Sequence, residues 1–542
     1  MKNLFLVLVV VGAIFLRFWH LGSNPPSLTW DEAAWGYNSY SLGVDGKDEF
    51  GKFLPITYLE SFGDFKPPLY AYLDVLPVKL LGLNEFSTRL PSAFFGVATV
   101  ILAFLLVKKL FDNSDVGKIS LVAAALLAIS PWHILLSRAA FEANVASFFI
   151  VFGVFLFLCS QEKYKWMIIF SVISFTLSMY TFNTARIVSP LLLIGLLIIK
   201  RKNIWVKMKK EVLLSGIIGV VIFLPLFLFL ITPQAKLRYN EVNIFSDPNV
   251  VATANQEIKN DNNAIFSKLI HNRRFLYGVE YLKHYFDNLN PQFLFIKGDG
   301  NPKFSIQDVG QMYIWEIPFF IAGILFLFKN RDKNWWILPY WFIIGIIPAA
   351  TARETPHALR IETILPTVQI LTAYGIVLLF TGIPQLYRKI HLRKLLTVIV
   401  VVIALFNFVY FYHNYTVSYP KEYSGEWQYG YKDAIAYVDS VKNSYDKIVM
   451  TEGLGRPYIY FLFYEKYDPK LYRQNAKMER EVLGFVHVNS FDKFIFTKDV
   501  PSVKLGHNNL YIDMPGNIPS NAKVLKTFKL LNGNASLIAY VR

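Results

Sequence analysis

The feature that most constrains this sequence is a series of long apolar segments along its first three quarters. Each segment has the length of a helix, contains few charged residues and is separated from the next by a polar connection. Apolar helices of this length are typical of chains that cross a lipid bilayer. The segments lie at residues 4–20, 88–107, 119–136, 141–160, 166–181, 185–200, 211–231, 312–328, 335–351, 361–382 and 395–412. We therefore predict a polytopic α-helical membrane protein with about eleven transmembrane helices.

The composition agrees with this prediction. The chain is 54% hydrophobic, only 17% charged and contains 47 Phe, which is outside the range of soluble proteins. Its net charge of +16 lies largely in short loops between apolar segments, so it indicates membrane orientation and no nucleic-acid partner. The single cysteine, Cys159, excludes an intramolecular disulfide and a cysteine-built zinc site. The first apolar segment lacks a cleavage site and is read as a retained helix.

The loop charges predict the orientation. With a cytoplasmic N-terminus, every loop on the cytoplasmic side is net basic, as the positive-inside rule requires. These loops contain residues 108–118, 162–165, 200–211, 329–333 and 388–394. On the opposite side, residues 21–85 contain nine acids and four lysines. We predict a multi-pass protein of the plasma (inner) membrane, with three large segments on the outer face, namely the loop 21–87, the loop 232–311 and the C-terminal tail.

Two domains are expected. Residues 1–413 form a transmembrane domain, in which residues 69–82 make an amphipathic helix at the membrane surface and the pair 166–181 and 185–200 makes two helices joined by a tight turn. Residues 414–542 form an extracytoplasmic α/β domain. The tail is expected to contain helices at 427–441 and 456–464, strands at 447–451, 493–497 and 509–514, and a hairpin around Asn532-Gly533.

The first outer loop contains the segment SLTWDEAAWGY, residues 27–37, in which Asp31 and Glu32 are flanked by tryptophans. Two acids among aromatic residues at a membrane boundary are costly to desolvate, which favours a functional role. Helix capping is the alternative, with Asp31 as the N-cap of a helix that begins at Ala33. Capping uses one acid only, so we predict that this segment is a catalytic loop in which an acid acts as general base.

Four basic residues on the outer face are candidates for binding a phosphate. Lys66 precedes Pro67-Pro68 and an interfacial helix, and the alternative is a lysine that reaches anionic lipid. Arg89 opens the second apolar segment. Arg138 lies four residues before Glu142, a spacing that also fits a plain helix salt bridge. Glu142 offers a third acid for a divalent cation or the acceptor. Arg186 at the outer end of two helices needs an anion, either a lipid phosphate or an acid.

The last candidate is the segment PHALR, residues 356–360, preceded by Arg353 and followed by Glu362. His357 and Arg360 are one helical turn apart, and this spacing predicts a clamp for phosphate or pyrophosphate. A lone histidine is more often structural. The two neighbouring arginines favour the binding role.

Taken together, these segments resemble a known family. An outer-loop Asp-Glu after the first helix, a KPPLY segment, a TRLPSA helix start, an R-x-x-x-E pair and a late PHALR are similar to the C-type (GT-C) glycosyltransferases. The resemblance covers residues 1 to about 410 and is closest to bacterial relatives of the protein O-mannosyltransferases and of the lipid A aminoarabinose transferase.

The resemblance implies an enzyme of the cell envelope that transfers a sugar from a polyprenyl-phosphate carrier to an acceptor on the outer face. The acceptor is a protein, as in protein glycosylation, a glycolipid or a cell-wall glycan. Asp31 would be the base for the acceptor hydroxyl, supported by Glu32, and Lys66 and Arg186 would hold the carrier phosphate. The family's use of metals varies, so dependence on a divalent metal ion stays open.

Three other functions are consistent with a polytopic chain. A transporter or flippase for lipid-linked sugars places ionisable residues within its spans, whereas the acids and arginines of this chain concentrate at the outer ends. A polysaccharide polymerase or ligase typically depends on basic and histidine residues in large outer loops. In a surface module without catalytic activity, the tail would do the binding.

Overall fold

The computed structural model describes residues 2–386, 390–481, 484–506 and 508–542. Arg388 and Lys389, part of the predicted basic loop 388–394, lie outside the described residues. The chain groups into two compact units. The first consists of residues up to 16, 96–136 and 143–409, and the second consists of residues 17–95, 137–142 and 410–542.

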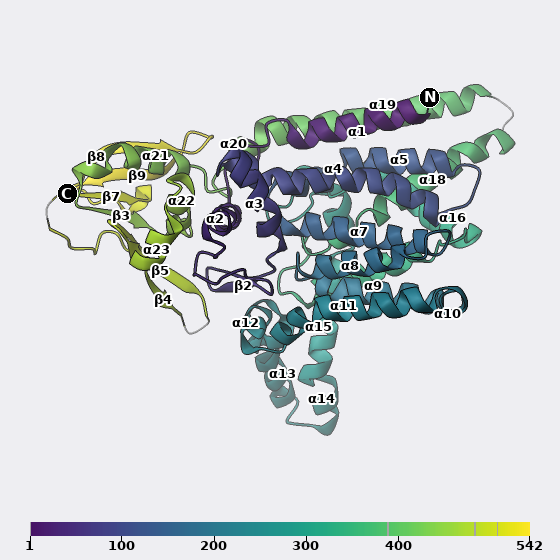
Figure 1. Ribbon diagram of the computed structural model, residues 1–542, viewed down its shortest axis with the longest axis horizontal. Coiled ribbons are helices and arrows are strands. Elements are labelled where there is room, and N and C mark those ends of the chain that lie inside the picture. Colours follow the sequence, from purple (N-terminus) through teal and green to yellow (C-terminus); the bar gives the residue numbers. More distant parts are fainter. Residues whose placement is uncertain (1, 387–389, 482–483, 507) are drawn as a thin grey trace. The chain divides into compact units, whose positions relative to one another are not determined.

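The first unit is a bundle of helices together with a smaller group of helices that projects from it (Figure 1). In the sequence, this smaller group lies between α11 and α16. The bundle helices, some of which begin or end in the second unit, are α1 (Lys2–Phe18), α4 (Glu85–Leu110), α5 (Val116–Ile129), α6 (Pro131–Arg138), α7 (Glu142–Ser160), α8 (Met167–Met179), α9 (Ala185–Ile199), α10 (Arg201–Lys207), α11 (Lys209–Leu230), α16 (Ile317–Asn330), α17 (Ile337–Ile346), α18 (Thr367–Leu386) and α19 (Ile390–His413). The smaller group contains α12 (Pro233–Val242), α13 (Pro248–Asn260), α14 (Ile265–Ile270) and α15 (Arg273–Asp287).

Several of these helices have the length and apolarity of a membrane span. In the described part of the chain, α4, α7, α11 and the stretch Arg393–Tyr423 meet both criteria, and the bent pair of α5 and α6 adds a fifth. Five further apolar helices are shorter. The predicted pair of helices at 166–181 and 185–200 is confirmed as α8 and α9. The number of about eleven spans stays a prediction.

The predicted single helix at 119–136 is wrong in one respect. The chain bends by 55° between α5 and α6. The bend occurs at Ser130, which has extended backbone angles (φ −60°, ψ 126°), immediately before Pro131. A residue before proline avoids the helical region and proline cannot donate a helical hydrogen bond, so the helix is interrupted there.

Glycines allow α16 and α18 to pack closely in the bundle. A Cβ atom on Gly323 would lie 1.9 Å from the carbonyl oxygen of Leu371, and one on Gly375 would lie 1.9 Å from that of Phe319. Only glycine lets two helix backbones approach this closely. Buried side chains of α4, α5, α7, α8, α9, α17 and α18 form one apolar core around this contact.

The second unit combines the first loop, residues 21–87, with the tail. The loop contains α2 (Trp30–Asp45), the hairpin of β1 (Leu59–Ser61) and β2 (Asp64–Lys66), and α3 (Leu69–Leu81), which confirms the predicted helix at 69–82. The tail contains α20 (Tyr419–Tyr423), α21 (Tyr431–Val441), β3 (Lys447–Thr451), α22 (Pro457–Tyr464), α23 (Pro469–Asn475), β4 (Lys477–Arg480), β5 (Val486–Phe491), β6 (Phe494–Thr497), β7 (Asn509–Asp513), β8 (Lys523–Lys529) and β9 (Ala535–Val541).

The tail forms a seven-stranded mixed sheet in the order β4-β5-β6-β3-β7-β9-β8. Strand β3 is parallel to both β6 and β7, while the outer pairs are antiparallel. The predicted strands at 447–451, 493–497 and 509–514, the helices at 427–441 and 456–464 and the hairpin at Asn532-Gly533 are all present within a few residues. The tail therefore has the predicted α/β structure.

The first loop and the tail share one hydrophobic core. Leu28, Ala33, Tyr37 and Phe62 from the loop pack with aromatic residues of the tail. The tail residues in this core include Tyr431, Tyr458, Phe461, Phe463, Tyr472 and Phe491. Burial of large apolar and aromatic side chains is the main stabilising contribution in such a core, so the loop and the tail are expected to fold together.

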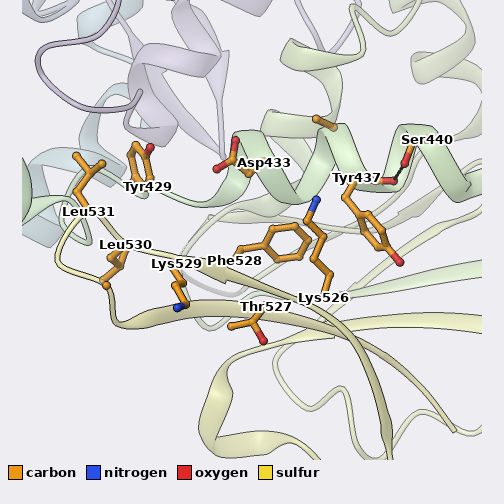
Figure 2. Close-up of a pocket in the computed structure, with 12 residues that line it drawn as sticks. Tyr429, Asp433, Tyr437, Ser440, Lys526, Thr527, Phe528, Lys529, Leu530 and Leu531 are labelled. Carbon is orange, nitrogen blue, oxygen red and sulfur yellow. Dashed lines mark hydrogen bonds between the residues drawn. The ribbon is translucent and has the colours of Figure 1, made fainter.

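A groove of about 650 Å³ lies on the tail between α21 and the β8–β9 hairpin (Figure 2). Tyr437 and Phe528 line it, and the ammonium of Lys526 lies 5.0 Å and 5.6 Å from the centroids of their rings. None of the candidate site residues predicted from the sequence lines this groove.

Candidate functional site

Asp31 and Glu32 of the first loop lie in the first turn of α2. This helix begins at Trp30, three residues before the start considered for capping, and its N-cap is Thr29 rather than Asp31. The Thr29 hydroxyl accepts a hydrogen bond from the Glu32 amide at 3.2 Å, and Glu32 accepts one from the Thr29 amide at 3.0 Å. The sequence signal was present, since Thr-x-x-Glu is a capping box.

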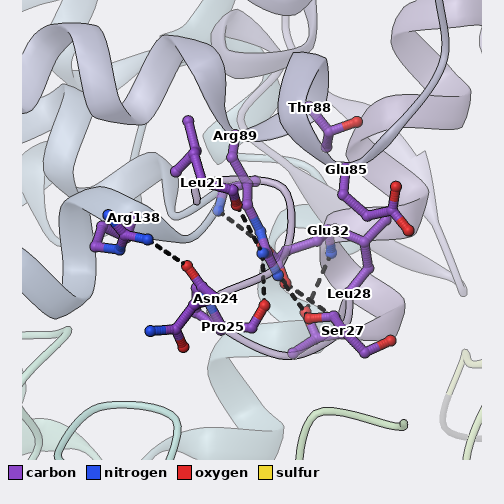
Figure 3. Close-up of polar contacts among 12 residues, drawn as sticks. Leu21, Asn24, Pro25, Ser27, Leu28, Glu32, Glu85, Thr88, Arg89 and Arg138 are labelled. Atoms are coloured by element: carbon purple, nitrogen blue, oxygen red, sulfur yellow. Dashed lines mark hydrogen bonds and ion pairs between the residues drawn. The ribbon is translucent and has the colours of Figure 1, made fainter. Parts of the chain in front are cut away.

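Glu32 is fully buried, and its carboxylate accepts hydrogen bonds from neighbouring groups (Figure 3). Arg89 donates to both of its oxygens, at 2.8 Å and 3.2 Å, and the Ala140 amide donates to it at 3.0 Å. Arg89 also donates to the carbonyl oxygens of Leu21, Pro25 and Ser27 at 2.5–3.1 Å. This network fixes the chain that leads into α2, because a buried charge pair is stable only when its hydrogen bonds are satisfied.

Asp31 lies in a different environment from Glu32. It forms an ion pair with Lys66, and its side chain is 51% exposed whereas that of Lys66 is 12% exposed. The lysine ammonium also lies 5.4 Å from the Trp35 ring and 5.3 Å from the Phe62 ring. The two adjacent acids therefore differ sharply, since one is buried within a network and the other faces solvent beside a cation.

The electrostatics keep Lys66 protonated. Burial by itself lowers the pKa of Lys66, but the charges of Asp31, Asp64 and Glu142 and the hydrogen bond to Asp31 hold this pKa above the ordinary lysine value. Glu142, the first residue of α7, interacts electrostatically with both Lys66 and Asp31. The second unit thus brings Asp31, Asp64, Glu142 and Lys66 into one cluster, with a positive charge among three acids.

The hairpin that ends in Lys66 is held by the tail. The Val486 amide donates to the Phe62 carbonyl at 2.9 Å, and the Arg456 guanidinium lies 5.7 Å from the Phe62 ring. Gly63 has a φ of +85°, and a Cβ atom there would lie 2.2 Å from the Gly484 carbonyl oxygen. Backbone contacts of this closeness require glycine, so the tail sets the position of the hairpin.

Arg138 is buried and binds backbone groups. Its guanidinium donates to the carbonyl oxygens of Trp19 and Asn24 at 2.8 Å each and to the Tyr415 hydroxyl at 3.1 Å. The helix salt bridge considered for Arg138 and Glu142 requires one continuous helix. It is not formed in that geometry, because α6 ends at Arg138 and α7 begins at Glu142.

The other candidates belong to the first unit. Arg186, the second residue of α9, donates to the Met179 carbonyl at 3.3 Å. Arg353 donates to the carbonyl oxygens of Asn243 and Ser246, both at 3.3 Å. These contacts tie Arg353 to the loop 232–311.

The PHALR segment forms turns rather than the helix on which the predicted clamp was based. The His357 ring packs against Phe304 with centroids 4.9 Å apart, and the Ala358 amide donates to the Asp299 carboxylate at 2.6 Å. Burial, with the nearby charge of Arg360, lowers the pKa of His357 to about 3. The imidazole is therefore neutral at physiological pH, and Arg360 supplies the positive charge of this segment.

One buried acid in the first loop was missed by the sequence interpretation. Glu49 accepts hydrogen bonds from Asn38 at 3.0 Å and from the Tyr458 hydroxyl at 3.1 Å. Burial raises the pKa of Glu49 to about 8. No local pattern distinguishes Glu49 from its neighbour Asp48, because the residue that buries it lies in the tail.

The described residues contain no clear set of metal ligands. Within the described ranges, no group of three or more His, Cys, Asp or Glu side chains is arranged to hold a metal ion.

Comparison with known proteins identifies the family pattern and the fold. Residues 65–229 match the family described as dolichyl-phosphate-mannose-protein mannosyltransferase. An uncharacterised protein of Aquifex aeolicus is 28% identical over 196 residues, and the match covers 35% of this chain and 36% of that protein. The match thus spans about a third of the relative's length.

Solved structures resemble the chain over most of its length. ArnT from Cupriavidus metallidurans in the apo state is 12% identical, with a TM-score of 0.54 over 98% of this chain and 97% of ArnT. ArnT bound to undecaprenyl phosphate gives a TM-score of 0.52 at 13% identity, over 98% and 97% of the two chains. The Archaeoglobus fulgidus oligosaccharyltransferase AglB, in complex with an inhibitory peptide and a dolichol-phosphate, is 15% identical, with a TM-score of 0.51 over 85% of this chain and 63% of AglB.

The chain is a multi-pass membrane protein with the fold of the C-type glycosyltransferases, as its motifs predicted. Within that class, residues 65–229 carry the sequence pattern of the dolichyl-phosphate-mannose-protein mannosyltransferases.

Proposed function

We propose that this protein is a membrane glycosyltransferase that moves a sugar from a polyprenyl-phosphate carrier to an acceptor on the outer face of the plasma (inner) membrane, with a cytoplasmic N-terminus. The family match and the fold support the class of enzyme. Two neighbours in fold were solved with undecaprenyl phosphate and dolichol-phosphate bound, which supports a carrier of this chemical type.

One observation carries the assignment of the base. Glu32 is buried and bound by Arg89, whereas its neighbour Asp31 is half exposed beside the protonated Lys66. A general base must reach the proton it removes and must be ionised, and a neighbouring cation favours the ionised carboxylate. Of the two acids, Asp31 therefore has the properties of the base, and Glu32 is a positioning residue.

The reaction follows from these charges. Asp31 takes the proton of the acceptor hydroxyl while the hydroxyl oxygen attacks the anomeric carbon of the sugar. The bond between that carbon and the phosphate oxygen breaks, and the polyprenyl phosphate leaves with the electron pair. Lys66 stabilises the negative charge that develops on the leaving phosphate. A direct displacement of this kind inverts the anomeric configuration.

The other predicted phosphate ligands have separate roles in this proposal. Arg89 and Arg138 position the first loop, since their guanidinium groups bind buried backbone carbonyls. Arg186, Arg353 and Arg360 stay candidate ligands of the carrier phosphate, with His357 as a neutral hydrogen-bonding neighbour. Glu142 is a second acid that tunes the cluster around Lys66.

The decisive experiment follows labelled sugar in membranes. Membranes that contain the wild type or Asp31→Asn are supplied with radiolabelled polyprenyl-phosphate sugars, and label in the endogenous acceptor is measured. We expect Asp31→Asn to lower transfer by about 10²- to 10⁴-fold, the usual effect of losing a general base. Carrier binding and expression are expected to persist.

Asp64→Asn is the matched control, because it removes an equal charge that also acts on Lys66. It should retain most of the transfer activity. Equal loss in both variants would assign the effect to local charge and not to a base at Asp31. If label crosses the bilayer on its carrier but never reaches an acceptor, the protein is a flippase and the proposal is wrong.

A further inference from the structure

The helices α14 and α15 expose a large apolar surface. Within it, Ile265, Phe266 and Leu269 of α14, and Phe275, Val279, Leu282 and Phe286 of α15, are each between 48% and 88% exposed. On α15 these residues recur at intervals of four, three and four, so they lie on one face of the helix. A soluble surface rarely carries a contiguous patch of this kind.

The opposite face of α15 is the one that packs against the protein. It presents polar groups that are satisfied there. The Tyr277 hydroxyl donates to the Asp247 carbonyl at 3.0 Å, and a His284 ring nitrogen lies 2.8 Å from the Ala352 carbonyl oxygen. At the side of the helix, the Tyr285 hydroxyl donates to the Ile343 carbonyl at 2.9 Å. The face of α15 that packs on the protein thus carries hydrogen-bonded polar groups, whereas its apolar face is open.

The position of these helices identifies what covers the apolar face. They belong to the group that projects sideways from the bundle, at the end of α11 that leads into α12 (Figure 1). Helix α11 is itself a candidate span whose most apolar window is only 17% buried. Its exposed apolar residues continue to Ile231, at the end of α11 from which this group of helices begins.

The charges beside the patch fit the same surroundings. Between residues 265 and 287 the chain carries Lys268, Arg273, Arg274 and Lys283 against two acids, Glu280 and Asp287. Basic side chains and tyrosines are typical at the headgroup level, where they flank apolar residues that enter the acyl region.

We propose that α14 and α15 lie in the surface of the membrane, with their exposed apolar side chains inserted into the leaflet in which α11 ends. This part of the loop 232–311 is therefore an interfacial anchor rather than an aqueous loop. The inference does not depend on the proposed reaction.

The test uses the full chain in vesicles and places a fluorescent label at single sites. Because Cys159 is the only cysteine, Cys159→Ser provides a cysteine-free background. Leu282→Cys and Leu269→Cys test the two helices, Val220→Cys on α11 reports a lipid-facing position, and Lys447→Cys on β3 reports an aqueous one. Each labelled protein is exposed to lipid brominated on its acyl chains and, separately, to iodide in the buffer.

We expect brominated lipid to quench the labels at Leu282 and Leu269 as strongly as the label at Val220, while the label at Lys447 is quenched by iodide only. Iodide quenching at both test sites without lipid quenching would overturn the proposal. Protection of both sites from both quenchers would also overturn it, in favour of a protein that covers this face. Two test sites guard against a single variant that fails to fold.

Discussion

At the scale of single residues, the site depends on the different environments of two adjacent acids. Asp31 and Glu32 follow one another in the chain, but successive positions on a helix point about 100° apart. Glu32 therefore turns into the protein toward Arg89, and Asp31 turns toward Lys66. A pair of acids that looks equivalent in the sequence has one fully buried member and one half-exposed member.

The structural role of Glu32 is testable by stability. Glu32→Gln leaves the fully buried Arg89 without its counter-charge, which is expected to cost about 3–5 kcal/mol of unfolding free energy. Unfolding of the purified protein in detergent measures this loss. The double variant Glu32→Gln/Arg89→Met removes both charges and should recover part of the stability. If Glu32→Gln unfolds like the wild type but loses transfer, Glu32 acts in the chemistry instead.

Glu49 predicts a pH dependence of stability. Burial raises its folded pKa from the ordinary value of 4.5 to about 8, so the folded state binds more protons than the unfolded state between these values. The stability that Glu49 contributes is fully present below pH 4.5 and is lost as the pH rises to about 8.

Glu49→Gln, which cannot titrate, should flatten that part of the profile. Unfolding of both proteins across the interval between the two pKa values checks this. Other acids whose pKa is raised by burial, such as Asp48 and Asp299, are retained in the variant, so the remaining slope reports their combined contribution. An unchanged slope in the variant would show that Glu49 does not titrate in this range.

At the scale of elements, the hairpin β1–β2 connects the tail to the site. Lys66 is the last residue of β2, and the turn of this hairpin packs on the backbone of Gly484 in the tail. The distance between Lys66 and Asp31 is therefore set by a contact that neither residue makes.

Gly63→Ala is expected to disturb that contact. The new Cβ would meet a carbonyl oxygen at 2.2 Å, and the hairpin must shift to accommodate it. We expect a loss of about 2–4 kcal/mol from the clash and the positive φ together, with a fall in the rate of transfer as Lys66 moves. Unfolding and transfer assays on the same preparation measure the two effects.

Gly533→Ala is the matched control, because Gly533 has a similar φ of +90° but no atom within 4 Å of an added Cβ. It carries only the conformational cost of about 1–2 kcal/mol and should transfer sugar normally. Equal behaviour of the two variants would mean that the Gly484 contact does not position the hairpin.

At the scale of the whole molecule, the tail is part of the fold of the first loop. Tyr460 donates to the Leu28 carbonyl at 3.0 Å, and Tyr458 donates to Glu49 at 3.1 Å. These bonds add to the shared apolar core. The tail therefore supports the candidate site structurally, and this role does not depend on the identity of the acceptor.

A chain that ends at Tyr423 should show this dependence. Without α21 to β9, the loop 21–87 loses the tail side of its core, and its aromatic residues become exposed. We expect limited proteolysis to cut within this loop in the shortened chain but not in the full chain, together with a loss of transfer. A shortened chain that resists cleavage there and remains active would contradict a shared core.

The sequence by itself determined the membrane class, the polytopic helical fold, the α/β tail and the motifs of a glycosyltransferase. These depend on apolar length, on local periodicity and on short segments such as Trp30-Asp31-Glu32, all of which are local properties of the chain. Even the cap at Thr29 is readable from its spacing to Glu32.

Only the tertiary structure decided how the two acids divide their roles. The partners of Glu32 lie 57 and 108 residues away in the chain, at Arg89 and Ala140, and Glu49 is buried by a tyrosine 409 residues away. Burial and ion pairing depend on such distant contacts, and no local pattern encodes them. The break at Pro131 and the turns of the PHALR segment were misjudged for a related reason. Unbroken apolar character in the first case and the spacing of His357 and Arg360 in the second were taken to mean a continuous helix.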